Sequence, residues 1–141
     1  MKRTLLLVMV LLHILSTAAN AGRLVDNADS SVTDNTTGLV WQQAEGGSKT
    51  WEQALTYCED LSLAGKNDWR LPNVKELESL TEDSLYNPAI DKTYFPAAYA
   101  SRYWSSTTYV NSSASAFYLA FDSGAVASYF KSNNYYVRCV R

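Results

Sequence analysis

The sequence has few of the residues that carry out common enzyme chemistry. Its single histidine, His13, lies in an apolar stretch near the N-terminus, so the remainder of the chain has none. Ser-His-Asp triads, Cys-His pairs and histidine metal sites all require an imidazole as base or ligand. The sequence therefore predicts that these sites are absent, and we expect neither a bound metal nor a cofactor.

The two cysteines, Cys58 and Cys139, are the next residues with distinctive chemistry. In an oxidising compartment, two cysteines within one small domain usually form a disulfide, and two free thiols are the alternative. A zinc site is disfavoured because it needs about four ligands and the histidines to supply them are missing. We therefore predict a disulfide that closes a long loop.

Carboxylates are the remaining candidates for catalysis. Glu78 and Glu82 are spaced to share one face of a helix, so a two-carboxylate hydrolase stays open as an alternative function. The Asp and Asn residues between Asp26 and Asn35 do not follow an EF-hand pattern, which needs a glycine and a distal glutamate. We interpret them as turn-forming residues.

Tyrosine is the residue type that most favours ligand binding in this chain. Most of the 10 tyrosines lie in the C-terminal half. A tyrosine presents a flat apolar ring with a polar tip, which suits contact with a carbohydrate or a protein. We expect Arg141 to add to a small basic patch among the binding candidates, which are Tyr109, Tyr129, Lys131, Asn133, Asn134, Tyr136 and Arg138.

The N-terminal segment has the pattern of a signal peptide. Lys2 and Arg3 precede an apolar stretch, and small residues end in Ala-Asn-Ala at Ala21. Export machinery recognises this order, which predicts cleavage after Ala21 and one domain over residues 22–141. The apolar stretch is shorter than the ~20 residues of a membrane span, although an uncleaved anchor is the alternative. We expect a periplasmic or extracellular protein without stable membrane insertion after cleavage.

The charge of the predicted mature chain excludes one class of partner. Removal of two basic residues leaves 12 − 2 = 10 basic against 14 acidic residues, so the net charge is −4. A mildly acidic surface has no general attraction for nucleic acid or anionic membrane. We therefore expect no nucleic-acid partner.

Two helices are expected in the first half of the domain. Thr50 and Gln53 form a capping-box pattern, and the apolar spacing that follows directs Cys58 inward, with Gly65 expected to end this helix. A second capping box begins at Asn73, and this shorter helix is expected to end near Thr81.

Strands are expected in the second half. Residues 116–121 and 125–130 flank an Asp-Ser-Gly turn and predict a hairpin, and residues 135–140 predict a final strand. The four tryptophans, Trp41, Trp51, Trp69 and Trp104, are expected in the core. The fold class is therefore α+β, with two helices packed on an antiparallel sheet.

Four ordered motifs add a family resemblance. They are Thr-Gly-Leu-Val-Trp at 37–41, Asp-Trp-Arg-Leu-Pro-Asn at 68–73, Tyr-Trp-Ser-Ser-Thr at 103–107 and Tyr-Val-Arg-Cys-Val-Arg at 136–141. With them the chain resembles the Lcl C-terminal domain family, a bacterial family long described as a domain of unknown function. The resemblance implies a C-type-lectin-like fold in which a long disulfide links the first helix to the last strand, as Cys58 and Cys139 would here.

The family's namesake is the tail of a surface adhesin that binds sulfated glycosaminoglycans. This chain departs from it because it lacks a collagen-like repeat and is acidic, and it also lacks the Glu-Pro-Asn and Trp-Asn-Asp motifs of calcium-dependent lectins. The Trp-Arg-Leu-Pro segment is also similar to the formylglycine-generating enzyme group, a likeness of fold that does not fix function.

The leading hypothesis is an exported, non-enzymatic binding module that recognises a glycan or a surface protein. A carboxylate-dependent hydrolase or a degenerate relative of the formylglycine group is one alternative, and a structural subunit of a surface assembly is another. The sequence leaves the oligomeric state open.

Overall fold

The computed structural model describes residues 22–141; the predicted signal peptide, residues 1–21, lies outside the described part. The described chain forms a small, sheet-rich α+β fold with two sheets and two helices. None of the helices in this part is long and apolar enough to cross a membrane.

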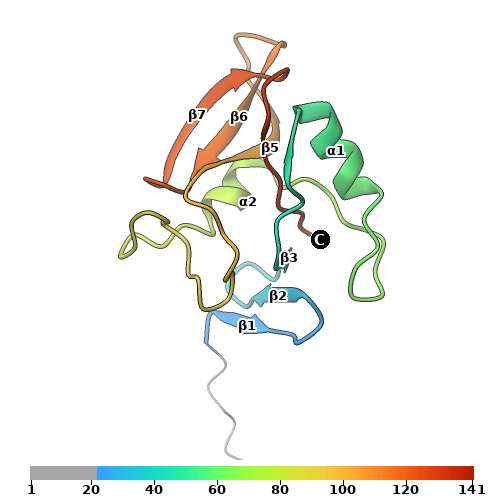
Figure 1. The fold of residues 1–141 in the computed structure, drawn as a ribbon, viewed down its shortest axis with the longest axis vertical. Helices are drawn as coiled ribbons and strands as arrows, with labels where there is room; N and C mark the ends of the chain where they lie inside the picture. The colour runs from blue at the N-terminus through green and yellow to red at the C-terminus, as the bar shows by residue number, and fades with distance from the viewer. Residues whose placement is uncertain (1–21) are drawn as a thin grey trace, which may run out of the picture.

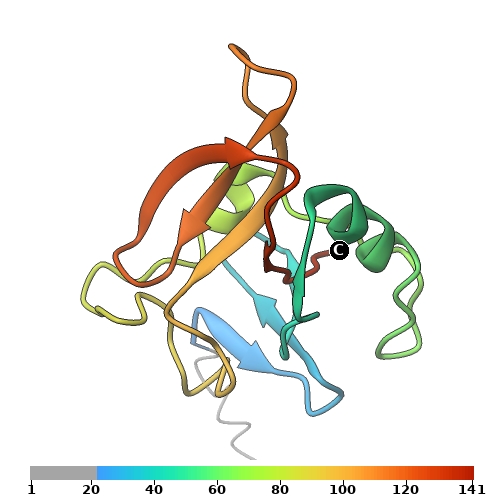
Figure 2. The same ribbon diagram turned by 45° about the horizontal axis from the view of Figure 1, so that its top comes forward.

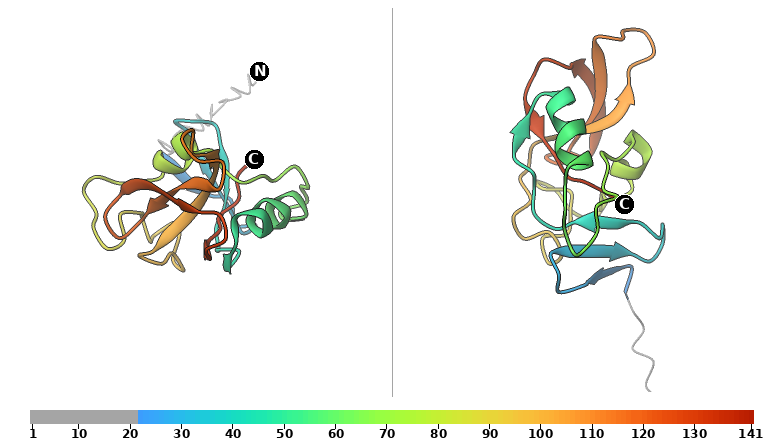
Figure 3. Two further views of the ribbon diagram at one scale, coloured as in Figure 1. Left: turned by 90° about the horizontal axis from the view of Figure 1, so that it is seen from above. Right: turned by 90° about the vertical axis from the view of Figure 1, so that its right-hand side faces the viewer.

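The smaller sheet lies at the N-terminal end of the molecule (Figure 1; right panel of Figure 3). It is antiparallel, with the order β1 (Leu24–Asp26), β2 (Ser31–Asp34) and β3 (Val40–Gln42). The expected turn-forming role of the Asp and Asn residues is confirmed at Asp26 and Asp29. Their carboxylates accept hydrogen bonds from the backbone N–H groups of Ala28 and Ser31.

The larger sheet has five strands in the order β4-β8-β5-β6-β7. Its strands are β4 (Ser48–Lys49), β5 (Arg102–Thr108), β6 (Ser115–Ala120), β7 (Ala125–Phe130) and β8 (Tyr135–Tyr136). The expected hairpin is confirmed, because β6 and β7 pair up to Ala120 and Ala125 around a turn with Gly124 at φ +77°. The sheet is not wholly antiparallel, since β8 runs parallel to β5.

Both helices begin where the sequence predicts. Helix α1 (Trp51–Glu59) has Thr50 as N-cap and a complete capping box with Gln53. Helix α2 (Val74–Glu78) begins after Asn73 with Glu76 as its capping partner. Both capping boxes satisfy backbone N–H groups that an isolated helix end leaves without partners.

Both helices end earlier than the sequence predicts. Asp60, not Gly65, is the C-cap of α1. Gly65 instead has φ +68° in a tight turn closed by hydrogen bonds between Leu63 and Lys66. Helix α2 ends at Glu78, with Ser79 as its C-cap, and not near Thr81. Gly65 therefore does adopt the positive φ that glycine favours, but in a turn that is separate from the helix.

The core lies on both faces of the larger sheet. Adjacent residues of a strand point to opposite faces, and Tyr103 and Trp104 of β5 are both fully buried. Tyr103 joins a cluster with Val32, Trp41, Leu77, Ile90, Phe95, Leu119 and Phe121. Trp104 joins a cluster on the α1 side with Ala54, Cys58, Trp69, Leu71, Val137 and Cys139. Three tryptophans are therefore in the core as predicted, whereas Trp51 is only partly buried.

The predicted disulfide is confirmed: Cys58 of α1 is bonded to Cys139, with a Cα–Cα distance of 5.5 Å. The last strand is shorter than predicted, because β8 ends at Tyr136 and the chain beyond it leaves the sheet. Val140 then forms isolated bridges with Trp41 and Arg70. The C-terminal segment, residues 137–141, thus connects α1, the smaller sheet and the segment before α2 (Figure 2).

Removal of the disulfide is expected to destabilise the fold strongly. The bond joins residues separated by 81 positions, for which the chain-entropy model gives about 4.5 kcal/mol. We predict that Cys58→Ala/Cys139→Ala lowers the free energy of unfolding by about this amount, measured by urea denaturation. Reduction of the wild-type protein should give a similar loss. A loss below about 1 kcal/mol would contradict the prediction.

The ion pair of Arg70 and Glu76 is expected to give an acid-dependent stability. The Arg70 guanidinium donates two hydrogen bonds to the Glu76 carboxylate, with N···O distances of 2.8 and 2.6 Å. These bonds lower the pKa of Glu76 below its usual range. The pair therefore stabilises the protein above the unfolded pKa of about 4.3, and the contribution is lost as pH falls through the lower folded pKa. We predict that Arg70→Gln lowers Tm at pH 7 and that the difference from wild type shrinks below about pH 4. A constant difference across this range would show that the pair's charge is not responsible.

Candidate ligand-binding site

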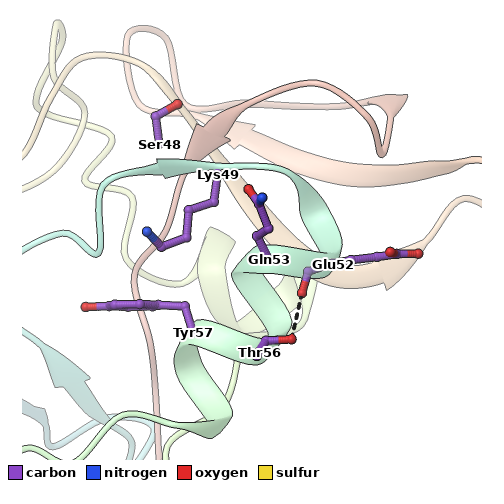
Figure 4. A pocket seen from close by; sticks show the side chains of 6 residues that line it. All are labelled: Ser48, Lys49, Glu52, Gln53, Thr56 and Tyr57. Carbon is purple, nitrogen blue, oxygen red and sulfur yellow. Dashed lines mark hydrogen bonds between the residues drawn. The ribbon is translucent and has the colours of Figure 1, made fainter.

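A groove lies between β4 and the first turns of α1. It has a volume of about 550 Å³ and is open along one side. Its lining is drawn in Figure 4 and consists of Ser48, Lys49, Glu52, Gln53, Thr56 and Tyr57.

Local chain geometry brings these side chains together. Strand β4 is held against β8 by the pairing of Lys49 with Tyr135, and the indole of Trp104 donates a hydrogen bond to the Lys49 carbonyl at 3.0 Å. Thr50 then begins α1 directly, so the helix turns back beside the strand. Gln53 and Tyr57 lie one helical turn apart on the same face. The groove is therefore a direct result of placing a helix start immediately after a short strand.

The ring of Tyr57 is a fixed wall of the groove. Its hydroxyl accepts a hydrogen bond from Gln42 Nε2 at 2.8 Å. Gly46 lies against the ring, and a Cβ atom at that position would be 2.2 Å from Tyr57 Cε1. Gly46 is required here because no side chain fits. The ammonium of Lys49 lies 4.8 Å from the ring centroid, within the range of a cation–π contact.

Several polar groups of the groove remain free to bind a ligand. Within residues 22–141, neither Lys49 nor Glu52 takes part in an ion pair. Gln53 uses its Oε1 atom to cap Thr50, which leaves its two amide N–H donors. The groove therefore offers an ammonium and an amide beside an aromatic ring, while the Glu52 carboxylate at its border points away from these groups (Figure 4). Such a combination of a few polar groups with a ring suits a small polar ligand.

A smaller notch of about 270 Å³ adjoins the groove and shares Glu52 with it. Its other lining residues are Thr50, Lys131 and Ser132. The Lys131 ammonium lies 3.9 Å from the Trp51 ring and donates to Thr108 Oγ1 at 2.9 Å. The backbone N–H of Trp51 in turn donates to the Lys131 carbonyl at 3.0 Å. The turn after β7 is thus held at the start of α1, next to the groove.

The sequence-predicted binding residues do not form one site. Lys131 borders the notch, while Asn133 is occupied within its own turn by a bond to the Phe130 carbonyl, and Asn134 is exposed. Tyr109 packs edge-on against Phe117 at 5.4 Å. The two remaining tyrosines lie elsewhere on the sheet.

Tyr129 and Tyr136 belong to separate aromatic groups. Tyr129 contacts Tyr135 at 6.4 Å, and Tyr135 also meets Tyr118 at 5.0 Å, with Arg102 beside both of these rings. Tyr136 follows Tyr135 in the strand and therefore points to the other face, where it stacks on Tyr99 at 4.7 Å.

Arg138 is not a surface residue, which corrects the predicted basic patch. Its side chain is fully buried, donates to the Gln42 and Gln43 carbonyls, and pairs with Glu45 at 3.1 Å. The prediction assumed an alternating strand up to residue 140, but β8 ends at Tyr136 and the alternation ends with it. Arg141 is also occupied, since it binds Asp68 at 2.7 Å.

The groove residues were missed by sequence analysis. Glu52, Gln53 and Thr56 are polar residues on the outer side of a helix, a pattern that usually indicates only a solvated face. The one useful signal was the glycine pair Gly46-Gly47, which marks a close approach of the backbone to another group. That signal does not identify Tyr57 as the group approached.

The structure gives no support to a paired-carboxylate site at Glu78 and Glu82. Glu78 pairs with Lys75 at 2.9 Å, and Glu82 pairs with Arg23 at 3.7 Å. In the described part of the chain, no three His, Cys, Asp or Glu side chains gather closely enough to hold a metal ion.

We predict that Arg138 has a structural role. Arg138→Gln leaves the buried carboxylate of Glu45 without its cation, and loss of one member of a buried pair costs about 3–5 kcal/mol. The double variant Arg138→Gln/Glu45→Gln should recover part of that loss, because it also removes the uncompensated charge. Urea denaturation of both variants checks this. A double variant no more stable than the single one would contradict the ion-pair explanation.

Comparison with known proteins identifies the family. No curated protein matches this chain. A family model, the Lcl C-terminal domain, matches residues 30–141, which include strands β2 to β8, both helices and both cysteines. The resemblance of the sequence motifs is therefore confirmed, and the chain belongs to the Lcl C-terminal domain family.

Proposed function

We propose that this protein is an exported, non-enzymatic binding module that recognises a glycan through the groove between β4 and α1. The observation that carries the proposal is the combination of the unpaired Lys49 ammonium and the free Gln53 amide donors with the fixed ring of Tyr57. The unpaired Glu52 carboxylate lies at the border between the groove and the notch. Sugar rings present hydroxyl groups at their edges and C–H groups on their faces. A groove with hydrogen-bonding side chains beside an aromatic ring matches both.

Export and cleavage after Ala21 are part of the proposal. The Cys58–Cys139 disulfide supports it, because such bonds form and persist in oxidising compartments. The mature protein would then comprise residues 22–141 and act in the periplasm or outside the cell.

A C-type-lectin-like classification is also proposed. It is supported by family membership and by a long-range disulfide between the first helix and the C-terminal segment. Fold class alone does not specify a ligand, so the glycan proposal depends on the groove and not on this classification.

The lining of the groove favours a glycan over a protein partner. Protein interfaces depend on a buried apolar centre with aromatic anchors. In the groove, by contrast, five of the six lining side chains end in a polar or charged group, and only Tyr57 supplies an aromatic ring. Lys49 is placed to bind a carboxylate or hydroxyl oxygen, and Glu52 to accept from a hydroxyl or an amino group. An uncharged or zwitterionic amino-sugar chain would satisfy both side chains.

The test is a glycan array with the purified protein, followed by calorimetry with the best ligand. A hydrogen bond to a charged group contributes about 1.5–3 kcal/mol. We predict that Lys49→Ala/Glu52→Ala weakens binding at least about tenfold while the free energy of unfolding stays close to wild type.

The matched control is Lys92→Ala/Glu59→Ala, which removes the same two charges at exposed positions outside the groove. It should bind as wild type does. Equal weakening in both double variants would indicate a general charge effect. No binding to any glycan on the array would reject the proposed function.

A further inference from the structure

Strand β7 is an open edge of the larger sheet. The sheet order ends with β7, which pairs with β6 along its whole length from Ala125 to Phe130 (Figures 1 and 2). The opposite edge, β4, is only two residues long and is followed at once by α1. The molecule therefore has one long strand edge without a neighbour in the described residues.

The direction of the free backbone groups on β7 follows from its partner strand. In antiparallel pairs the hydrogen-bonded residues alternate with residues whose N–H and C=O groups point away. The carbonyls of Ser115 and Phe117 in β6 accept bonds from the Tyr109 N–H and the Ser105 hydroxyl, on the β5 side. Their partners in β7, Phe130 and Ser128, therefore direct their backbone groups outward, and so does Val126.

These outward groups are not used elsewhere. Among the described residues, Val126 and Ser128 make no backbone bond outside the ladder, and only the Phe130 carbonyl accepts bonds from Asn133. The N–H and C=O groups of Val126 and Ser128, with the Phe130 N–H, thus form a row of donors and acceptors ready for another strand.

Natural edge strands usually carry a charge, a proline or a bulge that prevents such pairing. β7 reads Ala-Val-Ala-Ser-Tyr-Phe and has none of these devices. Its large side chains are also exposed: Val126 at 36%, Tyr129 at 47% and Phe130 at 56%. Both the backbone and the side chains of this strand lack a partner.

We propose that β7 pairs antiparallel with β7 of a second copy of this chain. Of the two-fold registers, one pairs all three outward residues with one another: Ser128 lies opposite Ser128 of the partner subunit, and Val126 opposite Phe130 of the partner subunit. The same register places Tyr129 opposite Ala127 of the partner subunit. Each aromatic side chain therefore lies opposite a smaller side chain, and the paired strands contain no charged residue.

The proposed pairing stops at two copies and does not cover the groove. A two-fold interface uses the same patch on both copies and does not continue into a filament. None of the residues of β7 lines the groove or the notch. The dimer is therefore independent of the proposed glycan function, although two grooves in one particle would increase avidity for a repeating glycan.

The test is sedimentation equilibrium of the wild-type protein and two charge variants. The wild type should be a dimer at micromolar concentrations. Val126→Lys/Phe130→Lys places like charges opposite each other twice and should raise the dimer Kd at least about tenfold. Val126→Lys/Phe130→Glu places opposite charges in the same positions and should remain a dimer whose Kd rises with salt.

The two variants alter exposed side chains and should keep the wild-type Tm when all three proteins are measured below the dimer Kd, which separates loss of pairing from loss of folding. A wild-type protein that is monomeric at millimolar concentration would overturn the proposal, as would a filament. Equal weakening of the dimer in both variants would overturn the register. Glycan binding by a monomeric protein would leave the proposed function intact while rejecting the dimer.

Discussion

Arg138 is a fully buried cation, and the partners of its two terminal nitrogens set the course of the chain from β3 to β4. Burial lowers the pKa of Arg138, while the nearby Tyr103 and Glu45 oppose that effect. Its guanidinium lies on the Phe95 ring and donates to two consecutive backbone carbonyls and to Glu45. Taking a charge out of water is costly, so these partners must stay in place. The segment 42–45 is thereby held against the C-terminal segment.

The groove depends on the same contacts. Gln42 uses Oε1 to accept from the Cys139 N–H and Nε2 to donate to the Tyr57 hydroxyl, so one side chain connects the C-terminal segment to the groove wall. Gly46 follows the fixed segment and donates its N–H to the Val137 carbonyl. A binding site is effective when its walls are held by surrounding contacts. Here the contacts of Arg138 and the Cys58–Cys139 disulfide fix the segments that position Gln42 and the Tyr57 ring.

The parts of the fold that could be predicted from the sequence are local or covalent. Both capping boxes need only residues three positions apart, and the β6–β7 hairpin needs a short turn. The disulfide followed from having two cysteines in one small domain behind a predicted signal peptide. Helix ends were less predictable, because Gly65 closes a turn of its own and not the helix before it. The α+β class follows from these elements, whereas the parallel pairing of β5 with β8 depends on contacts between distant segments.

The candidate site could not be predicted because its determinants are contacts and not residue types. An arginine near a C-terminus usually lies in solvent, and the sequence gives no sign that Glu45, 93 positions away, neutralises it. The groove residues likewise look like an ordinary solvated helix face until β4 is placed beside them. The tyrosines drew attention to the C-terminal half, yet most of their rings pack on one another. In this chain, therefore, the exposed aromatic residues cover the surface of the larger sheet. The candidate groove lies elsewhere, beside the backbone segment that the buried Arg138 holds in place.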